Sequence, residues 1–246
     1  MTAEPCKREE LLIHTIAGML EGCRHVAVGV LSPIPGAAAL LARERFGARV
    51  TILGAADPDY APDGGVELFD LAAQGKVDAF FLSGGQIDGE ANINLTGVGG
   101  YPRSKARWSG AFGSAFLYLQ VPRVILFRER HDPRALVERV DFVTAPGSSP
   151  PEVRRPGGPH ALVTDLCVFD WDKAKRRFRL ASVHPGVEPG AVRENTGFDY
   201  DDPENDTRTP EPSPAELERI RTVIAPELAR IYPAFAARVF GLETAA

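Results

Sequence analysis

The sequence predicts an α/β protein, built on an open, mostly parallel sheet with flanking helices. Short apolar runs alternate with helical patterns through the first half of the chain. The apolar runs contain few polar residues, as expected of strands that are buried on both faces. The spacing between runs leaves room for one helix each, and such strand–helix–strand units place their strands parallel, with right-handed crossovers.

The first half of the chain supplies three helices and three strands to this prediction. The first helix is amphipathic, because Leu12, Ile16 and Leu20 recur on one face at a period near 3.6 residues. The second helix has Pro35 in its first turn and Gly47 just beyond its end. In chain order we expect a helix at 7–22, a strand at 25–31, a helix at 35–46, a strand at 49–53, a helix at 66–74 and a strand at 77–82.

The second half is less regular. Residues 83–114 contain eight glycines and no periodic apolar signal, and so long an irregular stretch is usually functional or disordered. Residues 199–214 are acidic and proline-rich, which predicts an extended linker within a single domain that spans residues 1–246. Ser213 and Glu216 have the spacing of a capping box, so a helix begins there. We expect strands at 121–127, 138–144, 161–169 and 178–184, a surface loop at 147–159, and helices at 213–223 and 227–240 with an interruption at Pro233.

Composition excludes several classes of function. The net charge of −5 argues against a general binder of nucleic acids or of anionic membranes. No apolar run approaches the roughly 20 residues that span a bilayer. The first residues lack a secretory pattern, and the three cysteines are scattered, so we expect a cytoplasmic protein without a disulfide framework. The five histidines have no metal-binding spacing, and His184, at a strand end, is expected to pack structurally; we expect no bound metal.

Residues 83–94 are richest in candidate ligand contacts. They follow the expected strand at 77–82, and ligands of open α/β sheets bind beyond the carboxyl ends of strands. Paired glycines let a backbone approach a ligand, and Asp88 and Asn92 can hold the shape of the loop. A turn scaffold without ligand contact remains the alternative. The candidate contacts are Gly84, Gly85, Gln86, Asp88 and Asn92.

Two further segments carry candidate chemistry. Gly110 and Gly113 lie three residues apart and can present backbone amides to an oxyanion, or can form a tight turn before a regular element. Asp57, Asp59 and Asp63 follow the second expected strand and can supply a general base, or belong to a solvated loop. The basic residues at 103, 105, 107, 154 and 155 either meet phosphates or form a solvated surface.

Six stretches, taken together and in order, resemble the β subunit of family I CoA transferases, most closely the glutaconate and 3-oxoadipate type. The resemblance implies the open α/β fold shared by CoA transferases and some sugar-phosphate isomerases. It also implies an α-type partner subunit, in a heterodimer or heterotetramer, with the active site at the interface. The stretches are FFLSGGQID (80–88), NIN (92–94), VERVDFVTAPG (137–147), VTDLCVF (163–169), SVHPGV (182–187) and ENTGF (194–198).

The resemblance also implies covalent chemistry, and this chain lacks the residue that carries it in the family. In the family, a glutamate after the second strand attacks the thioester, and a glycine-rich loop stabilises the oxyanion. Gly54 stands where that glutamate is expected. Gly113 of the loop is kept, whereas Phe112 replaces a glycine and Phe116 an acidic residue. The steroid ring-opening acyl-CoA hydrolases, a branch that this chain also resembles, lack the glutamate too.

These observations predict a β-type subunit that acts on acyl-CoA, with CoA as part of the substrate and no tightly bound cofactor. Its chemistry is then hydrolytic, at a C–C bond or at the thioester. Gly110 and Gly113 are the expected oxyanion residues, and residues 84–92 the expected CoA contacts. Two alternatives remain open: a CoA transferase that uses another carboxylate, such as Asp57, and a non-catalytic scaffold. A stand-alone sugar-phosphate isomerase is disfavoured, because the loops match the transferase branch.

Overall fold

The computed structural model describes residues 4–55, 57–60, 66–100, 102–203 and 207–242. The chain divides into two compact units. Unit 1 comprises residues 1–79 together with 210–246, and unit 2 comprises residues 80–209. The chain returns from unit 2 to unit 1 at residue 210, inside the stretch expected as a linker.

Unit 1 is built on two parallel strands. β1 (His25–Val28) pairs with β2 (Arg49–Ile52), in a register that sets His25 opposite Arg49 and Val28 opposite Ile52. All residues of β1 are buried, as expected of an apolar strand covered on both faces. Both strands lie inside the ranges expected from the apolar runs.

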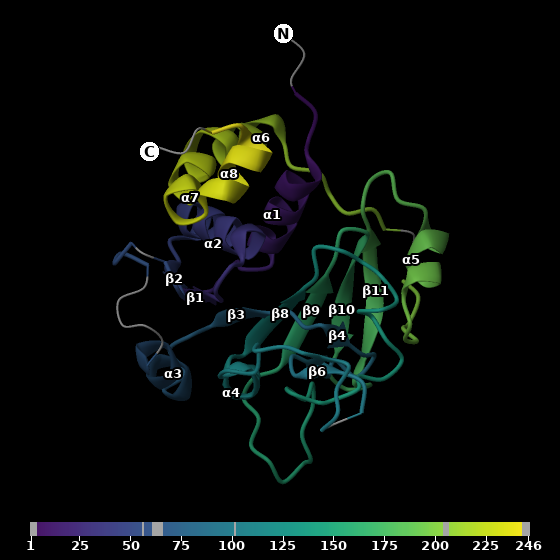
Figure 1. Cartoon of the computed structure of the whole chain (residues 1–246). Helices are drawn as coiled ribbons and strands as arrows, with labels where there is room; N and C mark the ends of the chain where they lie inside the picture. The colour runs from purple at the N-terminus through teal and green to yellow at the C-terminus, as the bar shows by residue number, and fades with distance from the viewer. Residues whose placement is uncertain (1–3, 56, 61–65, 101, 204–206, 243–246) are drawn as a thin grey trace. The chain divides into compact units, whose positions relative to one another are not determined.

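Unit 1 also contains helices, and most of those that the structure describes gather in one bundle (Figure 1). The second helix has prolines in its first turn, and Gly47 ends it with a left-handed φ of 76°. Glycine adopts this conformation at little energetic cost, so Gly47 ends the helix where the sequence predicts. The helices are α1 (Arg8–Gly18), α2 (Pro33–Phe46), α3 (Val66–Ala73), α6 (Pro214–Arg219), the π-helical η1 (Ile220–Ile224), α7 (Ala225–Ile231) and α8 (Pro233–Phe240).

The C-terminal helices run further than the sequence pattern indicates. The helix expected to end near residue 223 continues through η1 into α7. The π turn ends at Ile224, two residues before Pro226, whose ring nitrogen cannot donate the usual i to i−4 hydrogen bond. The expected interruption is at Tyr232, which has non-helical φ and ψ because it precedes Pro233.

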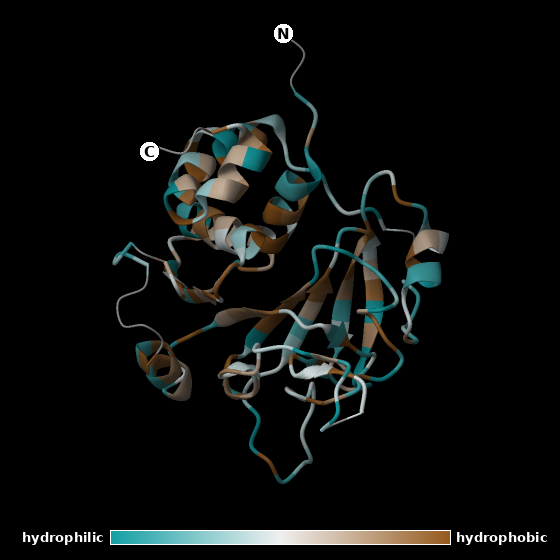
Figure 2. Ribbon diagram, in the orientation of Figure 1, coloured by the Kyte–Doolittle hydropathy of each residue, from teal (hydrophilic) through white to brown (hydrophobic). Residues whose placement is uncertain are grey.

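Unit 2 contains a sheet whose strands follow the order β11-β10-β9-β8-β3. β8 and β9 are parallel, whereas β10 pairs antiparallel with both β9 and β11. In Figure 2 the apolar residues are concentrated on the strands, and the long loops are mostly neutral or hydrophilic. The bounds are β3 (Ala79–Leu82), β8 (Arg123–Phe127), β9 (Pro159–Val163), β10 (Cys167–Asp172) and β11 (Arg177–Val183).

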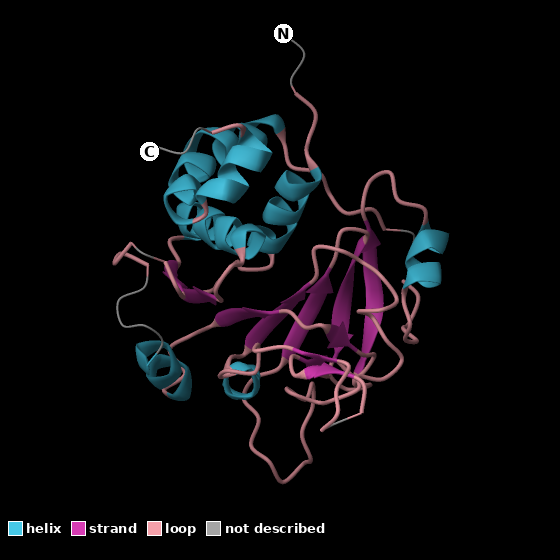
Figure 3. Ribbon diagram, in the orientation of Figure 1, coloured by secondary structure: helices cyan, strands magenta, loops and turns pink. Residues whose placement is uncertain are grey.

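The glycine-rich stretch at 83–114 is more ordered than expected. It forms two small antiparallel ribbons within the long loops of unit 2 (Figure 3). β4 (Gln86–Ile87) pairs with β5 (Ile93–Asn94), and β6 (Gly97–Val98) pairs with β7 (Ala106–Arg107). The stretch leads into α4 (Ser114–Gln120), and α5 (Pro189–Asn195) follows the sheet.

The prediction of a strand at residues 138–144 is wrong. Residues 138–144 run through bends instead. The backbone N–H of Asp141 donates to Oε1 of Gln86 at 2.9 Å, and that of Val140 to Oδ2 of Asp88 at 3.4 Å. Side chains of the first glycine-rich ribbon therefore accept hydrogen bonds from backbone N–H groups that, in a strand, would donate to a neighbouring strand.

The single strand expected at 161–169 is two strands. The chain turns after β9 and returns as β10. The hydroxyl of Thr164 accepts from the backbone N–H groups of Leu166 and Cys167, both at 3.2 Å, and this stabilises the turn. β10 and β11 also form a hairpin, because they pair antiparallel with Asp172 opposite Arg177.

Candidate active site

Asp88 fixes the conformation of residues 83–94, which we call the first glycine segment. Its side chain is only 3% exposed. One carboxylate oxygen accepts from the backbone N–H groups of Glu90 and Asn92, at 3.1 and 3.0 Å, and the other accepts from the side chain of Asn92 at 3.1 Å. Burial raises the pKa of Asp88, although these donors oppose the rise. Asp88 therefore orders the loop, as its place in a turn predicts.

Gln86 and Asn92 are also engaged by protein groups. The side-chain oxygen of Gln86 accepts from the side chain of Asn94 at 2.7 Å, and that of Asn92 accepts from the backbone of Gly147 at 3.2 Å. Gln86 is only 6% exposed. These bonds give both residues a structural role, and their contact with CoA stays a prediction.

Gly84 and Gly85 lie where no side chain fits. A β-carbon on Gly84 would stand 2.6 Å from Cγ2 of Ile93 and 2.8 Å from the backbone oxygen of Gln86. A β-carbon on Gly85 would overlap the indole ring of Trp108. The paired glycines therefore allow close packing inside unit 2, whatever else they contact.

Residues 108–113, the second glycine segment, pack against the first. The ring of Trp108 packs on Gly85, and Gly110 packs on Leu95, so closely that a β-carbon there would stand 2.9 Å from Cδ2 of Leu95. Leu95 directly follows Asn94, whose carbonyl accepts from the N–H of Gly85 at 2.9 Å. The two segments thus meet at Trp108 and Gly85 in unit 2, although the amide of Gly85 is itself engaged.

Gly113 connects the second segment to α4. It has a left-handed φ of 68°, a conformation that only glycine, asparagine and aspartate adopt readily. Phe112, which stands where the family resemblance implies a glycine, is 83% exposed. The segment therefore keeps a glycine at the strained position and presents an aromatic ring next to it.

Gly54 and Asp57 belong to unit 1. Gly54 follows β2 with a left-handed φ of 76°, and a β-carbon there would stand 3.3 Å from Cγ1 of Val30. Asp57 forms an ion pair with Arg230 and accepts from the backbone of Asp59 at 3.1 Å. The carboxylate of Asp57 is therefore already partnered. Asp63 lies outside the described residues.

A buried network of histidine and threonine side chains lies in unit 2. The two ring nitrogens of His131 lie 2.9 Å from the hydroxyl of Thr164 and 2.8 Å from that of Thr196. Those of His184 lie 2.8 Å from the hydroxyl of Thr209 and 2.9 Å from the carbonyl of Thr164. Burial lowers the pKa of His131 to about 4 and also lowers that of His184. Both rings are neutral at pH 7, in keeping with the structural role expected of His184.

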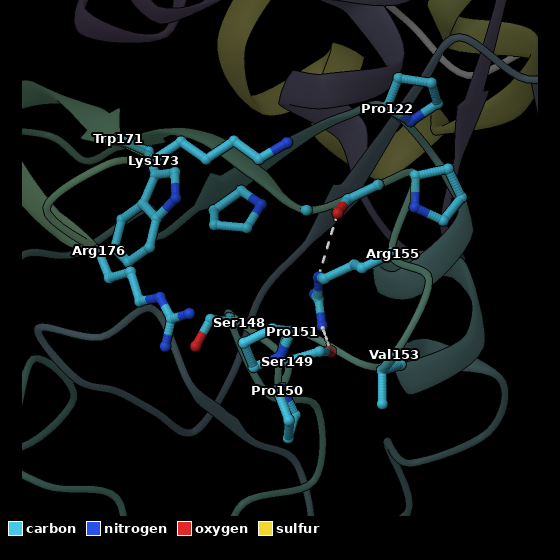
Figure 4. A pocket seen from close by; sticks show the side chains of 15 residues that line it. Pro122, Ser148, Ser149, Pro150, Pro151, Val153, Arg155, Trp171, Lys173 and Arg176 are labelled. Atoms are coloured by element: carbon cyan, nitrogen blue, oxygen red, sulfur yellow. Dashed lines mark hydrogen bonds between the residues drawn. The ribbon is translucent and has the colours of Figure 1, made fainter.

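At the basic residues 154–155, the side chain of Arg155 is already bound to protein groups. The guanidinium of Arg155 donates to the carbonyls of Tyr118, Pro146 and Gly157 and to the hydroxyl of Ser149. It also lines a cavity with residues of the β10–β11 turn (Figure 4). The sequence pattern does not reveal that cavity, because its two walls are separated along the chain.

No cluster of metal-binding side chains, meaning three or more His, Cys, Asp or Glu, occurs among the residues that the structure describes. Within the same residues, no helix is both long and apolar enough to cross a membrane.

The match that decides the family covers residues 23–195, which fit the family described as Coenzyme A transferase. The chain belongs to this family. It is 34% identical over 167 residues to the B-type subunit of the 3-oxoadipate CoA-transferase of Pseudomonas knackmussii, which covers 65% of the chain and 64% of that relative. It is also 34% identical to the B-type subunit of the glutaconate CoA-transferase of Acidaminococcus fermentans, over 153 residues that cover 59% of the chain and 56% of that relative. The matches therefore span less than two thirds of these two relatives.

Other proteins that resemble this chain are named for other chemistry. The chain is 29% identical to the cholesterol ring-cleaving hydrolase IpdB subunit of Rhodococcus jostii, over 67% of the chain and 66% of that relative. Among solved structures, R. jostii IpdAB superposes with a TM-score of 0.79 at 25% identity, covering 92% of this chain and 98% of that one. The decarboxylase AibA/AibB superposes with a TM-score of 0.73 at 26% identity, covering 97% and 100%.

The A. fermentans glutaconate CoA-transferase superposes with a TM-score of 0.78 at 25% identity, covering 92% of this chain and 97% of that one. The expected α/β fold, with a mostly parallel sheet and flanking helices, is confirmed by this likeness and by the parallel pairs β1–β2 and β8–β9. The resemblance to the β subunit of family I CoA transferases is confirmed as well, so the chain is a β-type member of a family of enzymes.

Proposed function

We propose that this chain is the β-type subunit of a heteromeric enzyme that hydrolyses an acyl-CoA, at a C–C bond or at the thioester, without a covalent intermediate on this chain. The observation that carries the proposal is Gly54. It stands where the family resemblance implies the attacking glutamate, and a glycine has no carboxylate with which to form an acyl anhydride. Asp57, the nearest carboxylate along the sequence among the described residues, is paired with Arg230.

The two neighbouring glycine segments support a role in stabilising negative charge. Attack of water on a carbonyl of the substrate places negative charge on its oxygen, and backbone N–H groups fixed in advance stabilise that charge. Gly110 and Gly113 are the residues to which we assign this task. The base that activates the water is assigned to the partner subunit.

The relatives support a partner subunit. Two of them are named as B-type subunits of CoA transferases, and solved structures of similar chains carry the paired names IpdAB and AibA/AibB. A partner of the α type would complete the site, and this chain would supply its glycine segments.

CoA transfer is the second candidate, because the two transferase subunits are 34% identical to this chain, more than the hydrolase subunit at 29%. Transfer requires a carboxylate that forms a thioester with CoA. On this chain Asp57 would have to leave its ion pair with Arg230 before it could attack.

Co-expression with the α-type chain encoded nearest to it tests the proposal. The purified complex is given acyl-CoA substrates in water enriched in ¹⁸O, without an acceptor acid. We expect turnover, with ¹⁸O in the product carboxyl group. Turnover only when a free carboxylic acid is added as acceptor would establish transfer and reject hydrolysis.

A matched pair of variants separates a catalytic subunit from a scaffold. Asparagine and aspartate both tolerate the left-handed φ of Gly113, and they differ in charge. If Gly113 lies beside the developing oxyanion, Gly113→Asp should lower kcat about tenfold or more relative to Gly113→Asn, because a carboxylate opposes that charge. Equal activity of the two variants, in complexes of unchanged assembly, would favour the scaffold.

A further inference from the structure

A cavity of about 250 Å³ lies in unit 2, between the β10–β11 turn and the loop at residues 147–159. Figure 4 shows Trp171, Lys173 and Arg176 on one side of it and Ser148 with neighbouring prolines across from them. Ligand pockets usually measure about 300–1,000 Å³, so this one suits part of a ligand better than a whole cofactor.

The charge of the cavity is positive and largely unbalanced. Its lining includes Arg155, Lys173 and Arg176 and no acidic residue. Arg155 is bound to protein oxygens and shapes the wall. Lys173 and Arg176 are exposed and form no ion pair with any residue that the structure describes. Two cations in the lining of a cavity, unpaired by any of the described residues, favour an anionic ligand.

Trp171 adds a flat aromatic surface beside these cations. Its ring packs edge-on against Phe178, with the centroids 5.1 Å apart and an interplanar angle of 70°, which fixes the indole in place. Trp171 is half-buried, so part of the ring faces the cavity. An aromatic face next to two cations is the combination that recognises a base carrying a phosphate.

The cavity is connected to the second glycine segment through α4. Gly113 lies at the start of α4, and Gly157, in the cavity lining, donates to the carbonyl of Leu119 at 2.8 Å, near the end of that helix. The seven residues of α4 rise about 10 Å at 1.5 Å each. The cavity thus stands about one short helix away from Gly113.

We infer that this cavity binds the phosphorylated adenosine end of CoA. This inference rests on the proposed function, which places the thioester at the glycine segments. The arm between the sulfur and the diphosphate of CoA has as many chain bonds as about four amino-acid residues, or about 13–14 Å when extended. That arm is long enough to join the glycine segments to the cavity, where Trp171 stacks on the adenine and Lys173 and Arg176 bind the 3′-phosphate.

Calorimetric titration of the full chain with CoA and with dephospho-CoA, which lacks the 3′-phosphate, tests the inference. The test variant is Lys173→Ala/Arg176→Asn. Asparagine tolerates the left-handed φ of 53° at Arg176, so the turn should keep its shape. The control is Arg134→Asn, which removes an 84% exposed arginine side chain outside this cavity.

We expect the double variant to bind CoA about tenfold more weakly than the wild type, and dephospho-CoA with less than about a threefold change. The control should bind both as the wild type does. Equal affinity of wild type and double variant for CoA, or equal weakening for both ligands, would overturn the assignment of the 3′-phosphate to these cations.

A second probe separates this inference from the proposed function. Adenosine 3′,5′-bisphosphate carries the adenosine end of CoA without the arm or the thioester. If it binds in a manner that depends on Lys173 and Arg176 while the complex consumes no acyl-CoA, the cavity assignment stands and the proposed function fails. If the complex consumes acyl-CoA with the same KM in the double variant, the cavity assignment fails and the proposed function stands.

Discussion

Gly85 shows how one position without a side chain shapes the candidate site. The missing β-carbon leaves room for the ring of Trp108, and this contact holds the second glycine segment against the first. The ring is 37% exposed and can swing outward if it is pushed. The packing of these two residues is therefore testable without knowledge of the substrate.

Gly85→Ala should displace the ring of Trp108 and lower the free energy of unfolding by about 1 kcal/mol, the lower end of the cost of overpacking. In a Trp171→Phe background, where Trp108 is the single tryptophan, its fluorescence emission should shift to longer wavelength as the ring enters water. Gly190→Ala is the matched control, since a β-carbon there meets no atom within 4 Å. An unchanged emission spectrum for Gly85→Ala would contradict the described contact.

His131 predicts a pH dependence of stability. Its folded-state pKa of about 4 lies below the value of about 6.5 for an unfolded histidine. The unfolded chain therefore binds more protons between these two pH values, so the free energy of unfolding falls as the pH falls through this window. The loss from His131 alone amounts to about 3 kcal/mol once pH 4 is reached.

His131→Gln removes the group that binds a proton on unfolding. The free energy of unfolding of this variant should therefore depend less steeply on pH, which urea unfolding at pH 7, 6 and 5 would measure. The pKa values of His14, His25, His160 and His184 are also lowered, with burial as the main cause, so a shallower slope should persist in the variant. Parallel slopes for wild type and variant would mean that folding does not lower the pKa of His131.

At the scale of elements, the capping box at the start of α6 acts as the sequence predicts. The hydroxyl of Ser213 accepts from the backbone N–H of Glu216 at 3.3 Å, and the carboxylate of Glu216 accepts from the backbone of Ser213 at 3.0 Å. Glu216 also lies 3.4 Å from His14 of α1, so the cap joins two helices of unit 1.

Ser213→Ala should therefore destabilise the start of the C-terminal helices by about 1 kcal/mol, whereas Ser213→Asp should retain most of the cap. Hydrogen exchange of the amides in residues 214–224 measures the local effect. The account of the cap is wrong if alanine and aspartate give the same exchange rates as serine.

Elements with strong local signals were predictable from the sequence. α2 is bounded by prolines at its start and by Gly47 at its end, and β1 is a continuous apolar run. The false strand at 138–144 has an apolar pattern of the same kind, but Gln86 and Asp88 take its backbone donors from about 50 residues away. Such a distant side-chain partner leaves no signal in the local pattern.

At the scale of the molecule, the candidate residues are divided between the two units. Unit 2 holds the two glycine segments and the cationic cavity, whereas unit 1 holds Gly54 and Asp57. The cavity was not expected from the sequence, because residues 147–159 and the β10–β11 turn meet only in the folded chain.

The central claim is that this chain acts on acyl-CoA without becoming covalently attached to it. The most direct measurement is mass spectrometry of both subunits after the complex has met its acyl-CoA and been treated with hydroxylamine, which converts an enzyme-bound thioester into a hydroxamate. The account predicts consumption of the acyl-CoA with no hydroxamate on any residue of this chain. A hydroxamate on this chain, at Asp57 or at any other carboxylate, would contradict it.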